Sequence, residues 1–259
     1  MGITIKTKKE IEILREGGKR LARVLDALTA EVKPGISTRE LNDLALKLIT
    51  EGGDTPSFLG YSPTGARRPF PAALCVSIND EVVHGIPNEE EKILKEGDIV
   101  TLDAGLIHEG LFTDSAVTVG VGKIDGKAEK LLEVTKKALM AGIKAVKDGA
   151  TTGDVGHAVE SCAKSSGTNF SIVRILAGHG VGYAVHEEPF VPNFGRRGEG
   201  TPLKAGMVIA IEPMFNEGGG EVILDKDGYT YRTRDGSRSA HFEHTVVVTA
   251  QGAEILTHL

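Results

Sequence analysis

Four acidic residues lie inside runs of strand-forming residues, where an unpaired charge is costly. Asp103 lies in IVTLDAGL, Asp114 in LFTDSAVTV, Glu212 in MVIAIEPMF and Glu243 in AHFEHTVVV. A lone acid in a strand often faces solvent, but Glu212 has apolar neighbours on both sides, and an ionised carboxylate there needs a partner. Two divalent cations would balance the four negative charges and relieve their mutual repulsion. The sequence therefore predicts that these carboxylates gather around metal.

Two histidines lie seven residues apart in the glycine-rich stretch GHGVGYAVHEEP, residues 178–189. The stretch matches neither phosphate-binding pattern, GxGxxG or GxxxxGK[ST]. Its glycines allow a close approach of the backbone, so that His179 or His186 could supply a nitrogen ligand to the predicted carboxylate site. Histidines in such a stretch are also common as parts of a core, and the residues alone leave both interpretations open.

A hairpin predicted at residues 108–110 connects two of the acids. A turn at His108-Glu109 pairs residues whose numbers sum to 217, which places Asp103 directly opposite Asp114 with Cβ atoms about 5 Å apart. A turn at Glu109-Gly110 would shift that pairing by two residues. Two like charges facing each other are destabilising unless they share a cation.

A helix near the N-terminus begins the predicted fold. Residues 7–10 read TKKE, a capping box with Thr7 as N-cap and Glu10 three residues later. Apolar residues then recur at helical spacing from Ile11 to Leu28. An amphipathic helix of this kind starts a folded domain, so we expect no targeting segment.

Three pairs of similar stretches occur in the same order along the chain. The first pair offers Thr38 and Thr152 as N-caps, each followed by an acid in the first helical turn. The other two pairs carry His-x-x-Pro and a strand that ends in an acid. The pairs are VKPGISTREL (32–41) with VKDGATTGDV (146–155), VHGIP (83–87) with VHEEP (185–189), and GDIVTLD (97–103) with GMVIAIE (206–212).

These repeats predict two homologous halves, roughly 10–120 and 125–250. Frequent hairpin signals, such as Asp227-Gly228 and Asp235-Gly236, favour antiparallel pairing. The predicted fold is α+β: a curved, mainly antiparallel sheet with helices on its outer face, whose halves are related by a pseudo-twofold axis.

The composition is that of a globular, water-soluble protein. The 259 residues are 40% hydrophobic and 25% charged, and the net charge of −6 argues against broad nucleic-acid binding. The two cysteines, Cys75 and Cys162, form no disulfide framework and fit a reducing cytosol. No apolar run approaches the roughly 18 residues of a membrane span, so neither membrane nor a specific nucleic-acid sequence is an expected partner.

Five motifs together resemble those of the type I methionine aminopeptidases, which are M24 metallopeptidases, from about residue 7 to 258. The resemblance implies the pita-bread (creatinase/aminopeptidase) fold in one catalytic domain, 1–259, around a dinuclear metal centre. It also implies a cytoplasmic monomer of bacterial type that removes the N-terminal methionine of nascent proteins, preferably before a small second residue. The motifs are CVSINDEVVHGIP, TLDAGLIHEGLFTD, GHGVGYAVHEEP, GMVIAIEPMF and SAHFEHTVVVT.

The resemblance also assigns roles to residues. His84 and His186 would contact the scissile amide and the tetrahedral intermediate, and Glu212 would move the proton of the attacking water. A hydroxide bridging two divalent ions would be the nucleophile. Four oxygens and one nitrogen suit Co, Mn or Fe as well as Zn. The implied ligands are Asp103, Asp114, His179, Glu212 and Glu243, of which Asp114 and Glu243 would bridge both ions.

The chain departs from the family pattern at several positions, some of them at the methionine side-chain pocket. By resemblance, Tyr61, Cys75 and Tyr229 would line it, and Phe58 and Phe70 are weaker candidates. The loop 62–73 is a few residues longer than usual. The family also commonly has other residues where Leu176, Val185, Tyr229 and His241 stand, with Trp at the third position and Gln at the last.

Alternative interpretations concern relatives and partners. A prolidase or Xaa-Pro aminopeptidase shares the ligand set, but usually has a further N-terminal domain and lacks SINDEVVHGIP. Type II enzymes have a helical insertion between the equivalents of His186 and Glu212, which only 25 residues separate here. A non-catalytic binding protein would be expected to lose ligands. The basic pairs Arg67-Arg68 and Arg196-Arg197 are interpreted as solvated surface or, alternatively, as a contact with the ribosome.

Overall fold

The computed structural model describes residues 2–63 and 65–259. Thr64, which belongs to the longer loop 62–73, and Met1 lie outside the described residues. Within the described residues, none of the helices combines the length and the apolarity needed to span a membrane.

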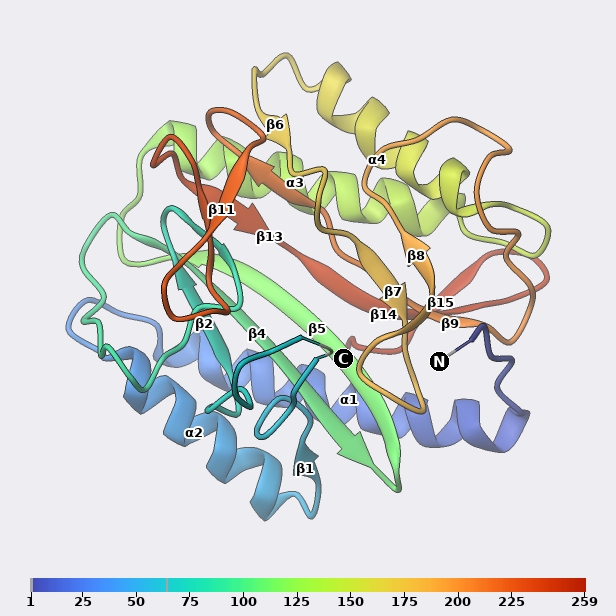
Figure 1. The fold of residues 1–259 in the computed structure, drawn as a ribbon, viewed down its shortest axis with the longest axis horizontal. Coiled ribbons are helices and arrows are strands. Elements are labelled where there is room, and N and C mark those ends of the chain that lie inside the picture. The colour runs from blue at the N-terminus through green and yellow to red at the C-terminus, as the bar shows by residue number, and fades with distance from the viewer. Residues whose placement is uncertain (1, 64) are drawn as a thin grey trace.

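A nine-stranded sheet crosses the middle of the molecule (Figure 1). Its order is β1-β4-β5-β14-β9-β7-β8, with β2 beside β4 and β15 beside β14, and every pairing within it is antiparallel. Two three-stranded sheets, β13-β10-β6 and β11-β12-β3, complete the fold. The strands are β1 Thr55–Pro56, β2 Cys75–Ile78, β3 Glu81–Val83, β4 Ile99–His108, β5 Leu111–Gly120, β6 Ser171–Ile172, β7 Gly178–Gly180, β8 Glu187–Val191, β9 Val208–Ile211, β10 Met214–Asn216, β11 Val222–Leu224, β12 Tyr231–Thr233, β13 Ser239–His241, β14 Glu243–Val248 and β15 Ala253–Ile255.

Two pairs of helices cover the sheet, one pair from each part of the chain (Figure 1). The first pair packs on β2 and β4 through one apolar core, and the second pair packs on β9 and β14 through another. The helices are α1 Lys8–Glu31, α2 Thr38–Glu51, α3 Gly126–Ala145 and α4 Thr152–Ser165. The predicted α+β architecture is therefore confirmed.

The helix caps differ from prediction at two of three positions. The capping box of Thr7 and Glu10 is confirmed. The predicted N-caps Thr38 and Thr152 are wrong by one residue, because Ser37 and Thr151 hold those positions. The reason is the reach of the acid at the third helical position, which bonds back to the N-cap backbone and so fixes where each helix begins.

The register of the β4–β5 hairpin also differs from prediction. Direct pairing of Asp103 with Asp114 is wrong: Asp103 lies opposite Ala116, and Asp114 lies opposite Gly105. The turn falls at Glu109-Gly110, where both residues have positive φ, 46° and 83°, as a two-residue hairpin turn requires. Because the shift is two residues, both carboxylates still point to the same face of the sheet.

Candidate active site

A single row of paired residues brings three site residues onto one face of the large sheet. Cys75 lies opposite Asp103, Asp103 opposite Ala116, and Ala116 opposite Glu243. Directly opposed residues point to the same face. Asp114 joins this face as a diagonal neighbour of Asp103. Four strands, β2, β4, β5 and β14, therefore supply the floor of the site.

The predicted site residues all line one cavity of about 170 Å³. Glu212 reaches it directly after the end of β9, and His179 from β7. The cavity also includes Pro63 from the loop 62–73, and Val83 and His241, to which the sequence assigned no role. The lining residues are Phe58, Tyr61, Pro63, Phe70, Cys75, Val83, His84, Asp103, Asp114, His179, His186, Glu212, Tyr229, His241 and Glu243.

Two triplets of side chains have ligand atoms close enough to hold an ion. Asp114, His179 and Glu243 form one triplet, and Glu212, His241 and Glu243 form the other, with all three ligand atoms of each within 4.8 Å of one another. Nε2 of His179 is also 3.3 Å from Oε1 of Glu212. Asp103 belongs to neither triplet, but it lines the same cavity.

The buried carboxyls of the site are electrostatically unfavourable without a cation. Burial raises the pKa of Asp103 to about 7, and the charge of Glu212 adds to the shift. Burial, followed by the neighbouring carboxylates, raises the pKa of Asp114 and of Glu243 well above the usual range. A bound divalent cation would favour the ionised forms and reverse these shifts.

The orphaned atoms of the site fit a metal centre. Oδ1 of Asp103, Oδ1 of Asp114 and Oε1 of Glu243 are buried, and no described residue gives them a hydrogen bond. His179 is oriented for ligation: its Nδ1 lies 3.0 Å from the carbonyl oxygen of Gly180, so its Nε2 faces Glu212. Carboxylates with imidazole suit divalent first-row metals.

His84 and His186 line this cavity as neutral imidazoles. Burial, above all, lowers the pKa of His84 to about 4. Residue 186 is exposed as a whole, but burial of its titrating group, above all, lowers the pKa of His186 to about 3. The Tyr61 hydroxyl and Nδ1 of His186 share a hydrogen bond of 2.7 Å. Both histidines can therefore donate or accept a hydrogen bond with a neutral substrate near pH 7.

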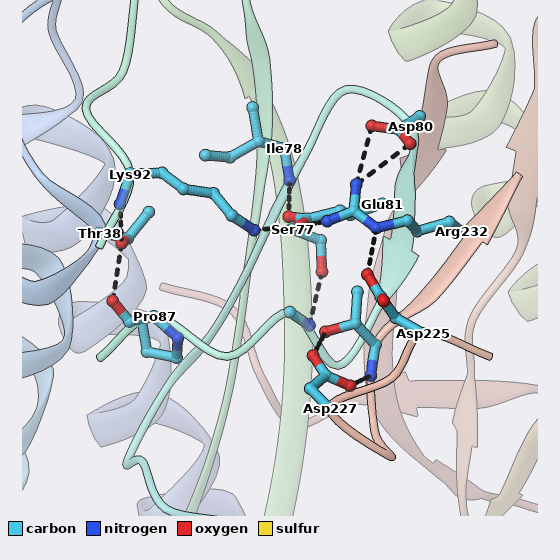
Figure 2. A network of polar contacts seen from close by, with 12 residues as sticks. Thr38, Ser77, Ile78, Asp80, Glu81, Pro87, Lys92, Asp225, Asp227 and Arg232 are labelled. Atoms are coloured by element: carbon cyan, nitrogen blue, oxygen red, sulfur yellow. Dashed lines mark hydrogen bonds and ion pairs between the residues drawn. The ribbon is translucent and has the colours of Figure 1, made fainter. Parts of the chain in front are cut away.

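A buried polar network fixes the strand that leads to His84. The Glu81 carboxylate, 1% exposed, accepts bonds from the Ile78 backbone, from Lys92 and from Arg232 (Figure 2). Arg232 also pairs with Asp80 and Asp225. His84 follows β3 with a φ of 59°, a strained conformation for a residue other than glycine. We expect the network to hold β3 and, with it, this conformation of His84.

A second buried ion pair supports the loop that carries His186. Nζ of Lys6 lies 2.8 Å from Oε2 of Glu187, and their side chains are 1% and 0% exposed. Thr4 donates to the same carboxylate, and the backbone amides of Tyr183 and Ala184 donate to its other oxygen. The N-terminal segment is thereby fastened to the turn that precedes His186.

An apolar wall closes one side of the cavity. Phe58, Phe70, Cys75, Val185 and Tyr229 pack together there, with Tyr61 at their edge. The predicted pocket residues thus lie side by side, next to the metal-ligand candidates. Leu176 does not line this cavity but a second one of about 390 Å³, whose lining also includes His84, His179 and His186.

The signal that could have identified His241 is its spacing. It lies two residues before Glu243, and residues two apart in an extended chain point to the same face. The predicted basic pairs lie outside the cavity lining: Arg68 pairs with Glu89, and Arg196 is 84% exposed.

The chain matches the family "Metallopeptidase family M24" over residues 12–250. It is 47% identical over 261 residues to the methionine aminopeptidase of Aquifex aeolicus, with all of both chains covered. Its structure superposes on the crystal structure of the methionine aminopeptidase of Rickettsia prowazekii with a TM-score of 0.93 and 44% identity, covering 98% and 99% of the two chains.

The prolidase alternative fits less well. The prolidase of Pyrococcus furiosus is 25% identical, with a TM-score of 0.75, and this chain covers only 65% of it. The fold is therefore the one shared by methionine aminopeptidases and prolidases, as the motifs predicted. By sequence over its full length and by structure, the chain belongs to metallopeptidase family M24 and, within that family, to the methionine aminopeptidases.

Proposed function

We propose that the chain hydrolyses the first peptide bond of peptides that begin with methionine. The observation that carries this proposal is one cavity in which orphaned carboxylates, two neutral histidines and an apolar wall meet. The carboxylates would face the reacting bond, and the apolar wall would receive an uncharged side chain. A preference for a small second residue is part of the same proposal.

The metal ligands would be Asp103, Asp114, His179, Glu212 and Glu243, holding two divalent ions. Bound ions supply Lewis acidity and an activated water near neutral pH. The chemistry of the donors allows Co, Mn, Fe or Zn. The raised pKa values of Asp103, Asp114 and Glu243 support this assignment, because these groups stay ionised near pH 7 only beside positive charge.

The remaining roles fall to residues around the reacting bond. Glu212 would take a proton from the attacking water and deliver it to the leaving amine. His84 and His186, being neutral, would bind the scissile amide and the oxyanion that develops from it. Tyr61, Cys75 and Tyr229, with Phe58 and Phe70, would receive the methionine side chain in the apolar wall.

The cellular setting is proposed on indirect grounds. Cys75 and Cys162 are both free, which fits a reducing cytoplasm. We propose that the chain acts there as a monomer on nascent proteins. Ribosome contact through the basic pairs Arg67-Arg68 and Arg196-Arg197 belongs to the same proposal.

Metal content and peptide cleavage test the function together. After gentle purification, elemental analysis should find divalent metal, and the protein should release methionine from Met-Ala-Ser. Metal without any release would favour a binding protein that kept the fold. Cleavage of Xaa-Pro peptides whatever the first residue would favour the prolidase reaction instead.

A further inference from the structure

His241 is a buried histidine to which the proposed function gives no role. It ends β13 and is 1% exposed, and neither ring nitrogen has a hydrogen-bond partner among the described residues. A buried polar group without a partner costs about 1–3 kcal/mol. An imidazole in this position therefore indicates a ligand that the polypeptide itself does not supply.

The backbone fixes where the His241 ring points. His241 is paired with Met214 across β10 and β13, and its backbone amide donates to Oγ1 of Thr118 at 2.9 Å. The same Thr118 hydroxyl donates to the carbonyl oxygen of His241 at 2.7 Å. Because both backbone groups are held, the ring is directed into the cavity, which it lines.

The distances around His241 are those of ligands on one ion. Its Nε2 lies 3.5 Å from Oε2 of Glu212 and 3.9 Å from Oε2 of Glu243. Two donors that each bind a metal at about 2.1 Å lie about 3.0 Å apart at a right angle and about 3.4 Å apart at a tetrahedral angle. The observed separations need only a small contraction to reach that range.

Glu212 lies between two imidazoles. Its Oε1 faces Nε2 of His179 at 3.3 Å, and its Oε2 faces Nε2 of His241 at 3.5 Å. Each oxygen of the Glu212 carboxylate therefore faces an imidazole nitrogen, and the two oxygen–nitrogen distances are nearly equal.

We propose that His241 is a sixth protein ligand of the metal centre, binding through Nε2 the ion that Glu212 and Glu243 contact. This inference rests on the proposed dinuclear centre. The centre then contains two nitrogen donors, His179 and His241, instead of one. Imidazole suits Zn, Fe and Co, whereas Mn and Mg favour oxygen donors, so His241 would bias the centre toward the first group.

X-ray absorption spectroscopy of the Co(II)-loaded protein counts imidazoles directly. We expect two imidazoles per centre in the wild-type protein and one in His241→Gln. His244→Gln is the matched control, because His244 points to a different cavity and its Nδ1 bonds Thr257. An equal count in wild type and His241→Gln, with His241 acting only as a hydrogen-bond donor to Glu212, would overturn the proposal.

Metal affinity gives a second readout. Competition titration should show that His241→Gln weakens Co(II) binding by at least about tenfold and Mn(II) binding by less. Equal losses for both metals would contradict the donor preference.

A measurement on the wild-type protein covers the case in which His241→Gln does not fold. The Co(II)-loaded protein should show two paramagnetically shifted imidazole N–H resonances, and a single resonance would refute the sixth ligand. Release of methionine from Met-Ala-Ser is measured on the same sample. Two imidazoles without release would leave the ligand assignment standing and refute the proposed function.

Discussion

At the scale of single residues, the site contains acidic side chains whose burial is energetically unfavourable without a cation. Asp103, Asp114 and Glu243 are buried acids in strands, and their orphaned oxygens have no described partner. Sequence reasoning could locate them because an acid within an apolar run conflicts with its surroundings. It noted His241 as a departure from the family pattern but gave it no role, because the neighbours of a lone histidine in space are unknown before the fold.

Asp103→Asn tests the raised pKa of Asp103 in the metal-free protein. The pKa of Asp103 is about 7 in the folded protein, against an ordinary value of 3.8, which we take for the unfolded chain. Between pH 4 and 7, the folded protein therefore keeps a proton on Asp103 that the unfolded chain releases. Stability of the wild type should therefore fall relative to Asp103→Asn as the pH rises from about 4 to 7, by roughly 2–4 kcal/mol. Urea unfolding in the presence of a chelator measures this difference.

Adding metal should reverse that order. The carboxylate of Asp103 is favoured beside a cation, so the metal-loaded wild type should be more stable than metal-loaded Asp103→Asn at pH 7. A difference between the two metal-free proteins that stays constant across the pH range would contradict the argument.

Tyr61→Phe separates the hydrogen bond to His186 from the apolar pocket. The ring stays in place, but the bond of 2.7 Å to Nδ1 is lost. A hydrogen bond worth about 0.5–1.5 kcal/mol predicts a loss in kcat/KM of roughly 2- to 10-fold, carried by kcat. Tyr183→Phe is the control, because that hydroxyl donates to Glu10. Steady-state kinetics on Met-Ala-Ser would show the difference, and equal losses in both variants would refute a role in orienting His186.

At the scale of elements, the N-terminal helix, the helices that follow residues 38 and 152 and the β4–β5 hairpin could be predicted, but their exact positions could not. The capping acids Glu40 and Asp154 were recognised, yet the N-caps were placed one residue late. The β4–β5 register was off by two, because either of two adjacent dipeptides could form the turn and only the folded sheet decides between them. A register error of two residues leaves every side chain on the same face of the sheet. The predicted set of site residues was therefore unaffected.

Arg232→Met tests whether the network in Figure 2 holds β3 and His84. Arg232 is partly exposed, but it bonds the buried Glu81 at 2.6 Å. Removing one partner of a buried ion pair is strongly destabilising. Because Arg232 is partly exposed, we expect Arg232→Met to lower the free energy of unfolding by only about 2 kcal/mol. We also expect a lower kcat. Arg234→Met, whose exposed pair with Glu221 spans 3.0 Å, should cost less than about 1 kcal/mol. Urea unfolding measures the stability of both variants. Similar losses would show that the buried network stabilises the fold no more than an exposed ion pair does.

Lys6→Met tests the N-terminal fastening of the loop before His186. Glu187 would be left as a buried charge without its cation, at an expected cost of about 3–5 kcal/mol. Adding Glu187→Gln to Lys6→Met should recover part of this stability, because the uncompensated charge is removed. Lys33→Met, in an exposed pair with Glu31, is the control. No recovery in the double variant would indicate that packing, and not charge, explains the loss.

At the scale of the whole molecule, the two parts of the chain meet at the β5–β14 ladder, and the site lies on this seam. Asp103 and Asp114 come from the first part, and His179, Glu212 and Glu243 from the second. The sequence repeats predicted this division, and each part has two helices packed on its own strands. We propose that the halves, roughly 10–120 and 125–250, arose from one duplicated unit; the repeats and the matching capping boxes at Ser37 and Thr151 support this.

Metal binding should couple the two halves, because its ligands are divided between them. At a metal concentration about 100 times the dissociation constant, binding adds about 2.7 kcal/mol to the free energy of unfolding. Hydrogen exchange measured by mass spectrometry should therefore slow in β4 and β5 and, to a similar degree, in β9 and β14. Asp114→Asn serves as the control, since losing a ligand should abolish the slowing on both sides of the seam. Slowing confined to one half in the wild type would mean that the metal is held by that half alone, and the shared centre would have to be abandoned.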